Sequence, residues 1–209
     1  MTPPRPHPGR LADALLLHVA AASGGRPDRW RVELGLGTAG AVLVDLALAG
    51  RVAVRPGHVT VRCADRVEDP VADEVLGALL LADRRRCLEG RLEHLAPRVY
   101  EAVLARLLEE RRLVFVPGGP GVPGASGGSG RPGRFAGFAA RRGGRHLPAR
   151  PLAAPPPGPH ADALAALVRA TRRERTPPGA PTPPEPAGTV CAAVTAALRS
   201  AAQTLTCPF

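Results

Sequence analysis

The sequence predicts a mainly helical domain built around a buried central helix, with short β-hairpins. The segment from about Gly37 to Ala49 is apolar on nearly every side, which is typical of a helix surrounded by protein. Other stretches repeat apolar residues at helical spacing, and only a few short segments alternate as strands do. The core must consist mainly of Leu, Val and Ala, since the 209 residues include one Trp, one Tyr and four Phe.

Apolar periodicity and turn residues predict the first elements. A helix is expected over Leu11 to Ala22, followed by Ser23-Gly24-Gly25, and Gly50 stops the central helix that comes next. The stretch RVAVRPGHVTVRC then places two alternating runs around Pro56-Gly57, which predicts a β-hairpin.

The middle of the chain continues with helices and a second pair of strands. Asp69 and Pro70 supply a capping residue and a first-turn proline for a helix in VADEVLGALLLAD. Another helix is expected from roughly Arg98 to Arg112, on the strength of its apolar stripe. LVFV (Leu113 to Val116) predicts a strand, and RFAGF (Arg134 to Phe138) its returning partner.

Proline and glycine divide the rest of the chain. Residues 1–10 form a Pro-rich start, expected to be disordered, and residues 11–174 form the main domain with a Gly/Pro-rich insertion at 117–133. HADALAALVRATRRER is an expected amphipathic helix of this domain. Residues 175–187 are a Pro-rich linker, and residues 188–209 contain a final helix, from near Thr189 to before Pro208, expected to pack on the domain.

Positive charge is concentrated in the second half of the chain. All 28 basic residues are Arg, with 17 Arg against 15 acidic residues in 1–112 but 11 against 3 in 113–209. Such a segment can attract an anionic membrane surface or nucleic acid. Asp45 interrupts the longest apolar run, so no membrane-spanning segment is expected. The four scattered cysteines indicate reduced thiols of a cytoplasmic protein.

Gly35, Gly37 and Gly40 match the G-x-G-x-x-G spacing that cradles a dinucleotide pyrophosphate. That site also needs a second parallel strand after the helix, and here a hairpin follows, which cannot supply it. The sequence therefore favours another interpretation of the three glycines, in which they form a flexible segment that leads into a close-packed helix.

Catalytic motifs are not assembled elsewhere. Ser126 fits a G-x-S-x-G pattern, but glycine and proline follow it where a hydrolase needs a helix, and the order of later acids and histidines cannot complete a triad. The sequence predicts a protein that is not an enzyme, with no metal and no cofactor. Trp30 stands between Arg29 and Arg31; from spacing alone, partial burial is favoured over a membrane-interface or ligand-stacking role.

The order of these segments resembles the Golgi phosphoprotein 3 family, including its bacterial relatives. The resemblance covers residues 11 to 116 and is most specific in LVDLALAGRV and DPVADEVL. It implies a mainly helical domain around a buried central helix. It also implies peripheral membrane binding through phosphatidylinositol 4-phosphate, with a Trp and several Arg around the headgroup and an apolar hairpin that enters the bilayer.

The residues of that headgroup pocket are carried over only in part. Trp30 stands where the family has its Trp. Where the resemblance implies three arginines, this sequence has Ala39, Pro97 and Tyr100, and Arg98 is a neighbour that a helix turns about 100° away. Losing three charge-assisted contacts should cost several kcal/mol, at about 1.5 kcal/mol each.

The leading hypothesis is a non-enzymatic, cytoplasmic, peripheral membrane protein that binds phosphatidylinositol 4-phosphate-type or other anionic headgroups. The candidate headgroup residues are Trp30, Arg29, Arg31 and Arg98. The candidate membrane-contact residues are Phe115, Arg131, Arg134, Phe135, Phe138, Arg141, Arg142 and Arg145. Each surface arginine near an anionic membrane can contribute about 1 kcal/mol, so this cluster could compensate for the missing pocket residues.

Two alternatives belong to other classes. A winged-helix-like nucleic-acid binder would use the central helix and the hairpin, but that helix is apolar on every face and offers no polar row for base edges. An interaction module would use TPPGAPTPPEP as a polyproline ligand, although a stiff spacer is the preferred interpretation of that segment.

Overall fold

The structure is a computed structural model, and it describes residues 10–22, 31–82, 87–116, 137–140, 158–172, 174, 183 and 185–206. These residues form six helices and two antiparallel strand pairs, which confirms the predicted mainly helical class. The helices are α1 (Leu11–Ala22), α2 (Arg31–Leu48), α3 (Pro70–Leu81), α4 (Leu88–Glu109), α5 (Pro159–Thr171) and α6 (Ala187–Thr206). The strands are β1 (Val52–Arg55), β2 (His58–Val61), β3 (Leu113–Val116) and β4 (Gly137–Ala140).

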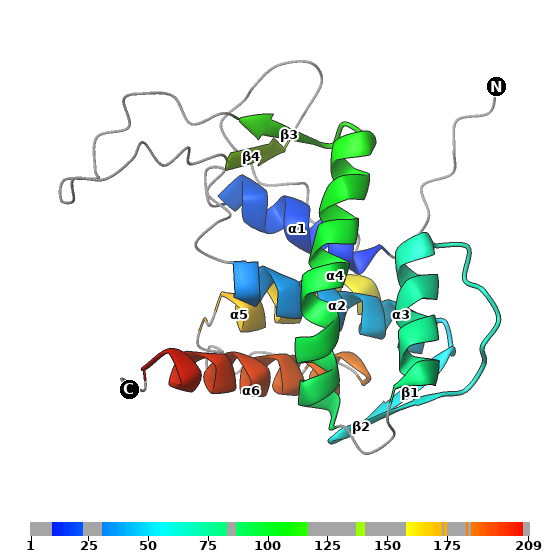
Figure 1. The fold of residues 1–209 in the computed structure, drawn as a ribbon. Helices are drawn as coiled ribbons and strands as arrows, with labels where there is room; N and C mark the ends of the chain where they lie inside the picture. The colour runs from blue at the N-terminus through cyan, green and yellow to red at the C-terminus, as the bar shows by residue number, and fades with distance from the viewer. Residues whose placement is uncertain are drawn as a thin grey trace, which may run out of the picture.

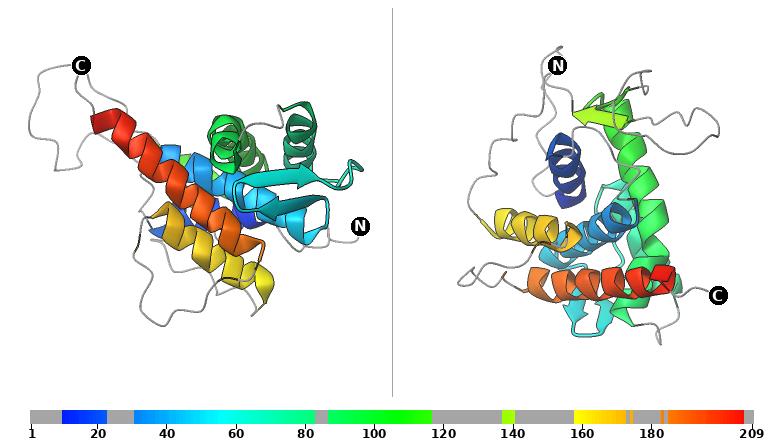
Figure 2. Two further views of the ribbon diagram at one scale, coloured as in Figure 1. Left: turned by 90° about the horizontal axis from the view of Figure 1, so that it is seen from below. Right: turned by 90° about the vertical axis from the view of Figure 1, so that its left-hand side faces the viewer.

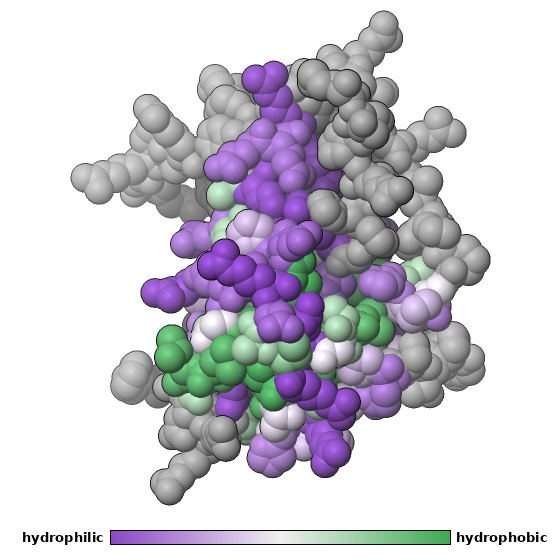
Figure 3. Space-filling view, turned by 90° about the vertical axis from the view of Figure 1, so that its right-hand side faces the viewer, coloured by the Kyte–Doolittle hydropathy of each residue, from purple (hydrophilic) through white to green (hydrophobic). Residues whose placement is uncertain are grey.

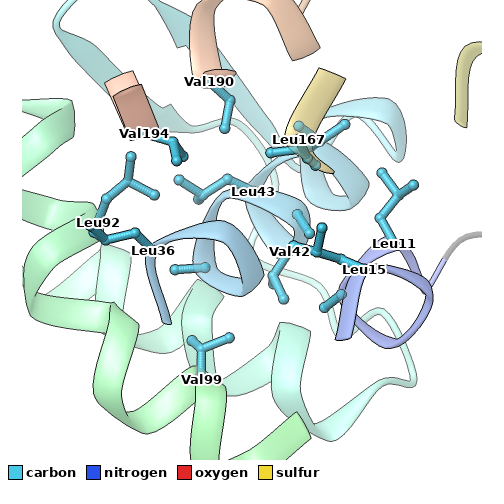
Figure 4. Close-up of a cluster of buried hydrophobic side chains, with 14 of the residues drawn as sticks. Leu11, Leu15, Leu36, Val42, Leu43, Leu92, Val99, Leu167, Val190 and Val194 are labelled. Atoms are coloured by element: carbon cyan, nitrogen blue, oxygen red, sulfur yellow. The ribbon is translucent and has the colours of Figure 1, made fainter. Parts of the chain in front are cut away.

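Helix α2 is the centre of the molecule, as its all-round apolar sequence predicts. Every residue from Leu34 to Val44 is buried. Helices α1, α4, α5 and α6 all contact α2 and surround it (Figures 1 and 2). Figure 4 shows apolar side chains from these four helices converging on α2, with Leu43 between Leu167 and Val194. The core is therefore almost entirely aliphatic.

The three glycines of α2 let its neighbours approach closely. A Cβ atom added at Gly35 would lie 3.2 Å from the backbone oxygen of Ala96, and one at Gly40 would lie 2.8 Å from Val194 Cγ2. The prediction that the helix starts near Gly37, after a flexible entry, was wrong: it starts at Arg31 and contains all three glycines. Burial against α4 and α6 offsets the helix-weakening effect of glycine. Helix α2 begins before the glycines and contains them, so the strand, turn and helix of a dinucleotide fingerprint are not formed at these residues.

The β1–β2 hairpin and α3 have their predicted places. Val52 pairs with Val61 and Arg55 with His58 across a turn in which Gly57 has a φ of 76°. Helix α3 starts after Asp69, whose side chain accepts hydrogen bonds from the N–H groups of Val71 and Ala72. Proline at the first helical position and this cap fix the start of the helix.

Helix α4 is longer than predicted. It starts at Leu88, ten residues before the expected Arg98, and it contains Pro97. Proline removes one backbone hydrogen bond inside a helix. Leu88, Leu92 and Leu95 are buried on the earlier turns, and this burial holds the segment helical across the proline.

The remaining elements close the domain. Strands β3 and β4 pair with Phe115 opposite Phe138, and β4 spans Gly137–Ala140. The returning strand predicted at 134–138 is confirmed at residues 137 and 138, and residues 134–136 lie outside the described residues. Helices α5 and α6 pack on each other and on α2. Helix α6 begins at Ala187, close to the predicted Thr189, and buries Val190 and Val194 completely.

Candidate functional site

Arg31 lies at the start of α2 with its side chain 62% exposed. Its guanidinium carbon is 6.0 Å from the centre of the Tyr100 ring, and Nη2 is 3.8 Å from Glu101 Oε1. Both contacts are at the long end of their class and add little stability at an exposed site. The guanidinium therefore keeps an open side. Arg29 and Trp30, the candidates next to it, lie outside the described residues.

The three positions where the resemblance implies arginine carry no charge in the fold either. Ala39 is fully buried in α2, and Tyr100 is only 4% exposed on the side of α4 that faces α2. Pro97 is exposed on α4 but offers no donor. The close approach of Gly35 to Ala96 leaves α2 and α4 in direct contact beside these positions.

Arg98 lies on the exposed side of α4, three residues before Glu101. It lines a groove of about 360 Å³ between the end of α3 and the first half of α4. Arg91 and His94 line the same groove, together with apolar residues that include Leu79, Leu81 and Leu95. Arg31 is not among the lining residues, so the structure does not join Arg31 and Arg98 in one cavity.

Two of the candidate membrane-contact residues lie on the described strands. Phe115 of β3 and Phe138 of β4 are directly opposite each other in the antiparallel register. The other six candidates, Arg131, Arg134, Phe135, Arg141, Arg142 and Arg145, lie outside the described residues, as does Ser126.

A buried ion-pair cluster was not recognised from the sequence. Arg106 of α4 binds Asp13 of α1 through Nη2 and Asp69 through Nη1, the latter at 2.9 Å. Arg10 Nε adds a 2.9 Å contact to Asp69. Asp13 is 1% exposed, and burial raises the pKa of its carboxyl although Arg106 opposes the rise. The one sequence signal for this cluster is Asp13, an acidic residue inside the mostly apolar first helix.

Asp45 lies beside this cluster and is the most strongly perturbed acid. Its Oδ2 accepts the N–H of Leu11 at 2.8 Å, and its Oδ1 is 3.8 Å from His160 Nε2. Burial raises the pKa of Asp45 to about 8; the Leu11 hydrogen bond opposes that rise, and the charges of Asp69 and Asp13 add to it. Asp45 and His160 line a second cavity, of about 280 Å³. The carboxyl group is therefore mostly protonated at neutral pH and holds the start of α1 to α2.

The described side chains offer no metal centre, and the thiol of Cys191 is not activated. No group of three or more His, Cys, Asp or Glu within the described ranges is placed to hold a metal ion. Cys63, Cys87 and Cys191 are free, and burial raises the pKa of the Cys191 thiol to about 12, which suppresses the reactive thiolate. Cys207 lies outside the described residues.

Nucleic-acid recognition by the central helix receives no support from the fold. The winged-helix alternative requires α2 to enter a DNA groove beside the β1–β2 hairpin. Residues 34 to 44 of α2 are covered by protein on every side, so they have no face left for a duplex.

A comparison with protein families identifies a family for the chain. The family model for Golgi phosphoprotein 3 (GPP34) matches residues 11–205, which is nearly the whole chain. The match extends through α5 and α6, well beyond residues 11 to 116, which carry the resemblance in the sequence. No curated protein and no solved structure matches the chain.

Proposed function

Because the chain belongs to the Golgi phosphoprotein 3 family, we propose that it is a peripheral membrane protein that binds anionic lipid headgroups and has no catalytic role. The family match over residues 11–205 is the observation that carries this proposal. None of the helices in the described part of the chain is long and apolar enough to cross a bilayer. The proposed association is therefore with the membrane surface.

Charge supports the proposal. The chain has a formal net charge of +10, and the excess lies mostly in residues 113–209. Basic residues near an anionic membrane contribute about 1 kcal/mol each. In this proposal Arg131, Arg134, Arg141, Arg142 and Arg145 meet lipid phosphates.

The apolar contribution comes from aromatic residues. Trp30 would sit at the level of the headgroups, where its amphipathic ring is favoured. Phe115, Phe135 and Phe138 would contact acyl chains. The cross-strand pairing supports this, because Phe115 and Phe138 are opposite each other in the antiparallel register of the hairpin.

The binding should be only weakly selective among anionic headgroups. A phosphomonoester is normally held by several charge-assisted contacts from arginine. Ala39, Pro97 and Tyr100 supply none of them. Arg31 and Arg98 are exposed near these positions, but they do not line one cavity. Phosphatidylinositol 4-phosphate would then be bound through its charge, as other anionic lipids are.

The test is co-sedimentation of the full chain with vesicles of phosphatidylcholine and phosphatidylglycerol. Trp30→Ala and reversal of the loop arginines, Arg131, Arg134, Arg141, Arg142 and Arg145, to Glu should each weaken binding. Arg199→Glu, an exposed change on α6, is the matched control and should have a small effect per charge. Intact binding by both test variants would refute the proposal.

A further inference from the structure

The end of α3 exposes large apolar side chains beside basic ones. Leu80 is 53% exposed and Leu81 91% exposed, although both belong to a helix whose other leucines and valines are buried. Figure 3 views the side of the molecule on which α3 and the β1–β2 hairpin lie, and hydrophobic surface gathers on its lower part. An exposed apolar patch bordered by polar residues is typical of an interaction site.

The groove next to these leucines is positively charged. Arg91, His94 and Arg98 line it from α4, and no carboxylate is among its lining residues. His94 and Arg98 are exposed on the outer side of α4. Leucines that protrude beside Arg98 and His94 match the chemistry of an anionic bilayer surface, which offers hydrocarbon beneath a layer of phosphates.

We propose that this surface, formed by Leu80, Leu81, His94 and Arg98, is a second membrane contact of the protein. Leu81 and Leu80 enter the boundary between headgroups and acyl chains, and Arg98 and His94 meet lipid phosphates. The inference rests on the proposed function, since it takes the membrane as the partner. It adds Leu80, Leu81 and His94 to Arg98, which is already a candidate headgroup residue, and it uses no residue of the β3–β4 hairpin.

The position of the groove on α4 defines an orientation. The groove uses the first half of α4, whereas β3 follows the other end of this helix. Helix α4 has 22 residues and is about 33 Å long. A flat membrane that touches both the α3 end and the β3–β4 hairpin must therefore run along α4 rather than across one of its ends.

The test compares exposed leucines at two helix ends. The full chain carries the double change Leu80→Ser and Leu81→Ser, or Leu48→Ser as the control, because Leu48 is an exposed leucine at the end of α2. Neither change alters charge. Binding to vesicles of phosphatidylcholine and phosphatidylglycerol should weaken about tenfold or more for the double variant, since two apolar side chains no longer leave water. The control should bind as the wild type does.

A second pair of variants tests the charge. Arg98→Gln should weaken vesicle binding about fivefold, whereas Arg199→Gln on α6 should change it little. All four variants should keep the circular dichroism spectrum of the wild type, because the altered side chains are exposed.

The outcomes separate this inference from the proposed function. If the wild type binds anionic vesicles and the leucine and Arg98 variants bind equally well, the groove does not contact the membrane and the hairpin mechanism stands. If the wild type binds no vesicles, both proposals are wrong. Loss of binding in the test variants only, with both controls unaffected, is the result we expect.

Discussion

Gly40 and Gly77 both lie inside helices, but their surroundings differ. A Cβ atom at Gly40 would lie 2.8 Å from Val194 Cγ2, while one at Gly77 in α3 would meet nothing within 4 Å. We expect Gly40→Ala to lower the free energy of unfolding by about 1 to 3 kcal/mol, since α6 must move away from α2. Gly77→Ala should raise it by about 0.5 to 1 kcal/mol, because alanine stabilises a helix relative to glycine.

Urea unfolding of both variants followed by circular dichroism measures these changes. Gly77→Ala is the control for the intrinsic helix preference of the substitution. A Gly40→Ala protein as stable as the Gly77→Ala protein would show that α2 and α6 are not in close contact.

Asp45 should make stability depend on pH. Its pKa is raised from the ordinary 3.8 to about 8, chiefly by burial. Between these values the folded chain keeps the proton while the unfolded chain releases it. The contribution of Asp45 to stability is therefore full below about pH 4 and is lost as pH rises toward 8. Each unit of pKa difference is worth about 1.4 kcal/mol. We expect the free energy of unfolding to fall by about 2 kcal/mol or more between about pH 5 and pH 8.

Asp45→Asn isolates this effect. The amide keeps an acceptor for the Leu11 N–H but does not titrate, so the decline of stability with pH should become much shallower. A residual decline is expected from Asp13, whose pKa is also raised by burial. Denaturant unfolding across the pH range gives both slopes, and identical slopes for the two proteins would contradict the assignment.

At the scale of elements, Arg106 ties three segments together. Its guanidinium binds the buried Asp13 of α1 and also Asp69, which caps α3. Arg106→Met leaves Asp13 without its main partner in a buried site, and breaking such a pair typically costs about 3 to 5 kcal/mol. Arg31→Met breaks a contact to Glu101 between exposed side chains and should cost less than about 1 kcal/mol.

Thermal unfolding monitored by circular dichroism distinguishes these two costs. Arg31→Met is the matched control, because it removes the same side chain from a surface pair. Comparable melting temperatures for the two variants would mean that the cluster around Arg106 does not hold α1, α3 and α4 together.

The sequence predicted elements well where local signals and packing agree. The start and end of α1 follow from its apolar pattern, the first hairpin from Pro56-Gly57, and the start of α3 from Asp69 and Pro70. Local signals misled where burial opposes them. Proline disfavours a helix interior, so helix α4 was predicted to begin only after Pro97. The glycines of α2 likewise led to a predicted helix start that was too late. Only contacts with other helices explain why both segments are helical.

The candidate site was less predictable than the fold. The family resemblance suggested that Arg31 and Arg98 act together at a headgroup, but Arg98 lines the α3–α4 groove and Arg31 lies over Tyr100. Arg106 pairs with Asp69, which is 37 positions away in the sequence, and with Asp13, which is 93 positions away. No local sequence pattern indicates such pairing. In the sequence, Leu80 and Leu81 are indistinguishable from the other apolar residues of their helix. Only the structure shows that they are exposed.

The molecule as a whole combines the fold of its family with uncharged residues at the positions where the resemblance implies headgroup-binding arginines. The chain matches the Golgi phosphoprotein 3 family over residues 11–205, yet Ala39, Pro97 and Tyr100 are uncharged. If charge alone drives membrane association, added salt should weaken binding to anionic vesicles, because surface charges are screened within about 8 to 10 Å at physiological ionic strength.

The most direct test compares phosphatidylinositol 4-phosphate with another anionic lipid at matched charge. The purified full chain is sedimented with phosphatidylcholine vesicles, with vesicles that contain phosphatidylglycerol, and with vesicles that contain phosphatidylinositol 4-phosphate at the same surface charge. The account predicts equal binding to the two anionic sets and little binding to the neutral one. A clear preference for phosphatidylinositol 4-phosphate would contradict it, because a selective headgroup pocket would then exist without the three arginines.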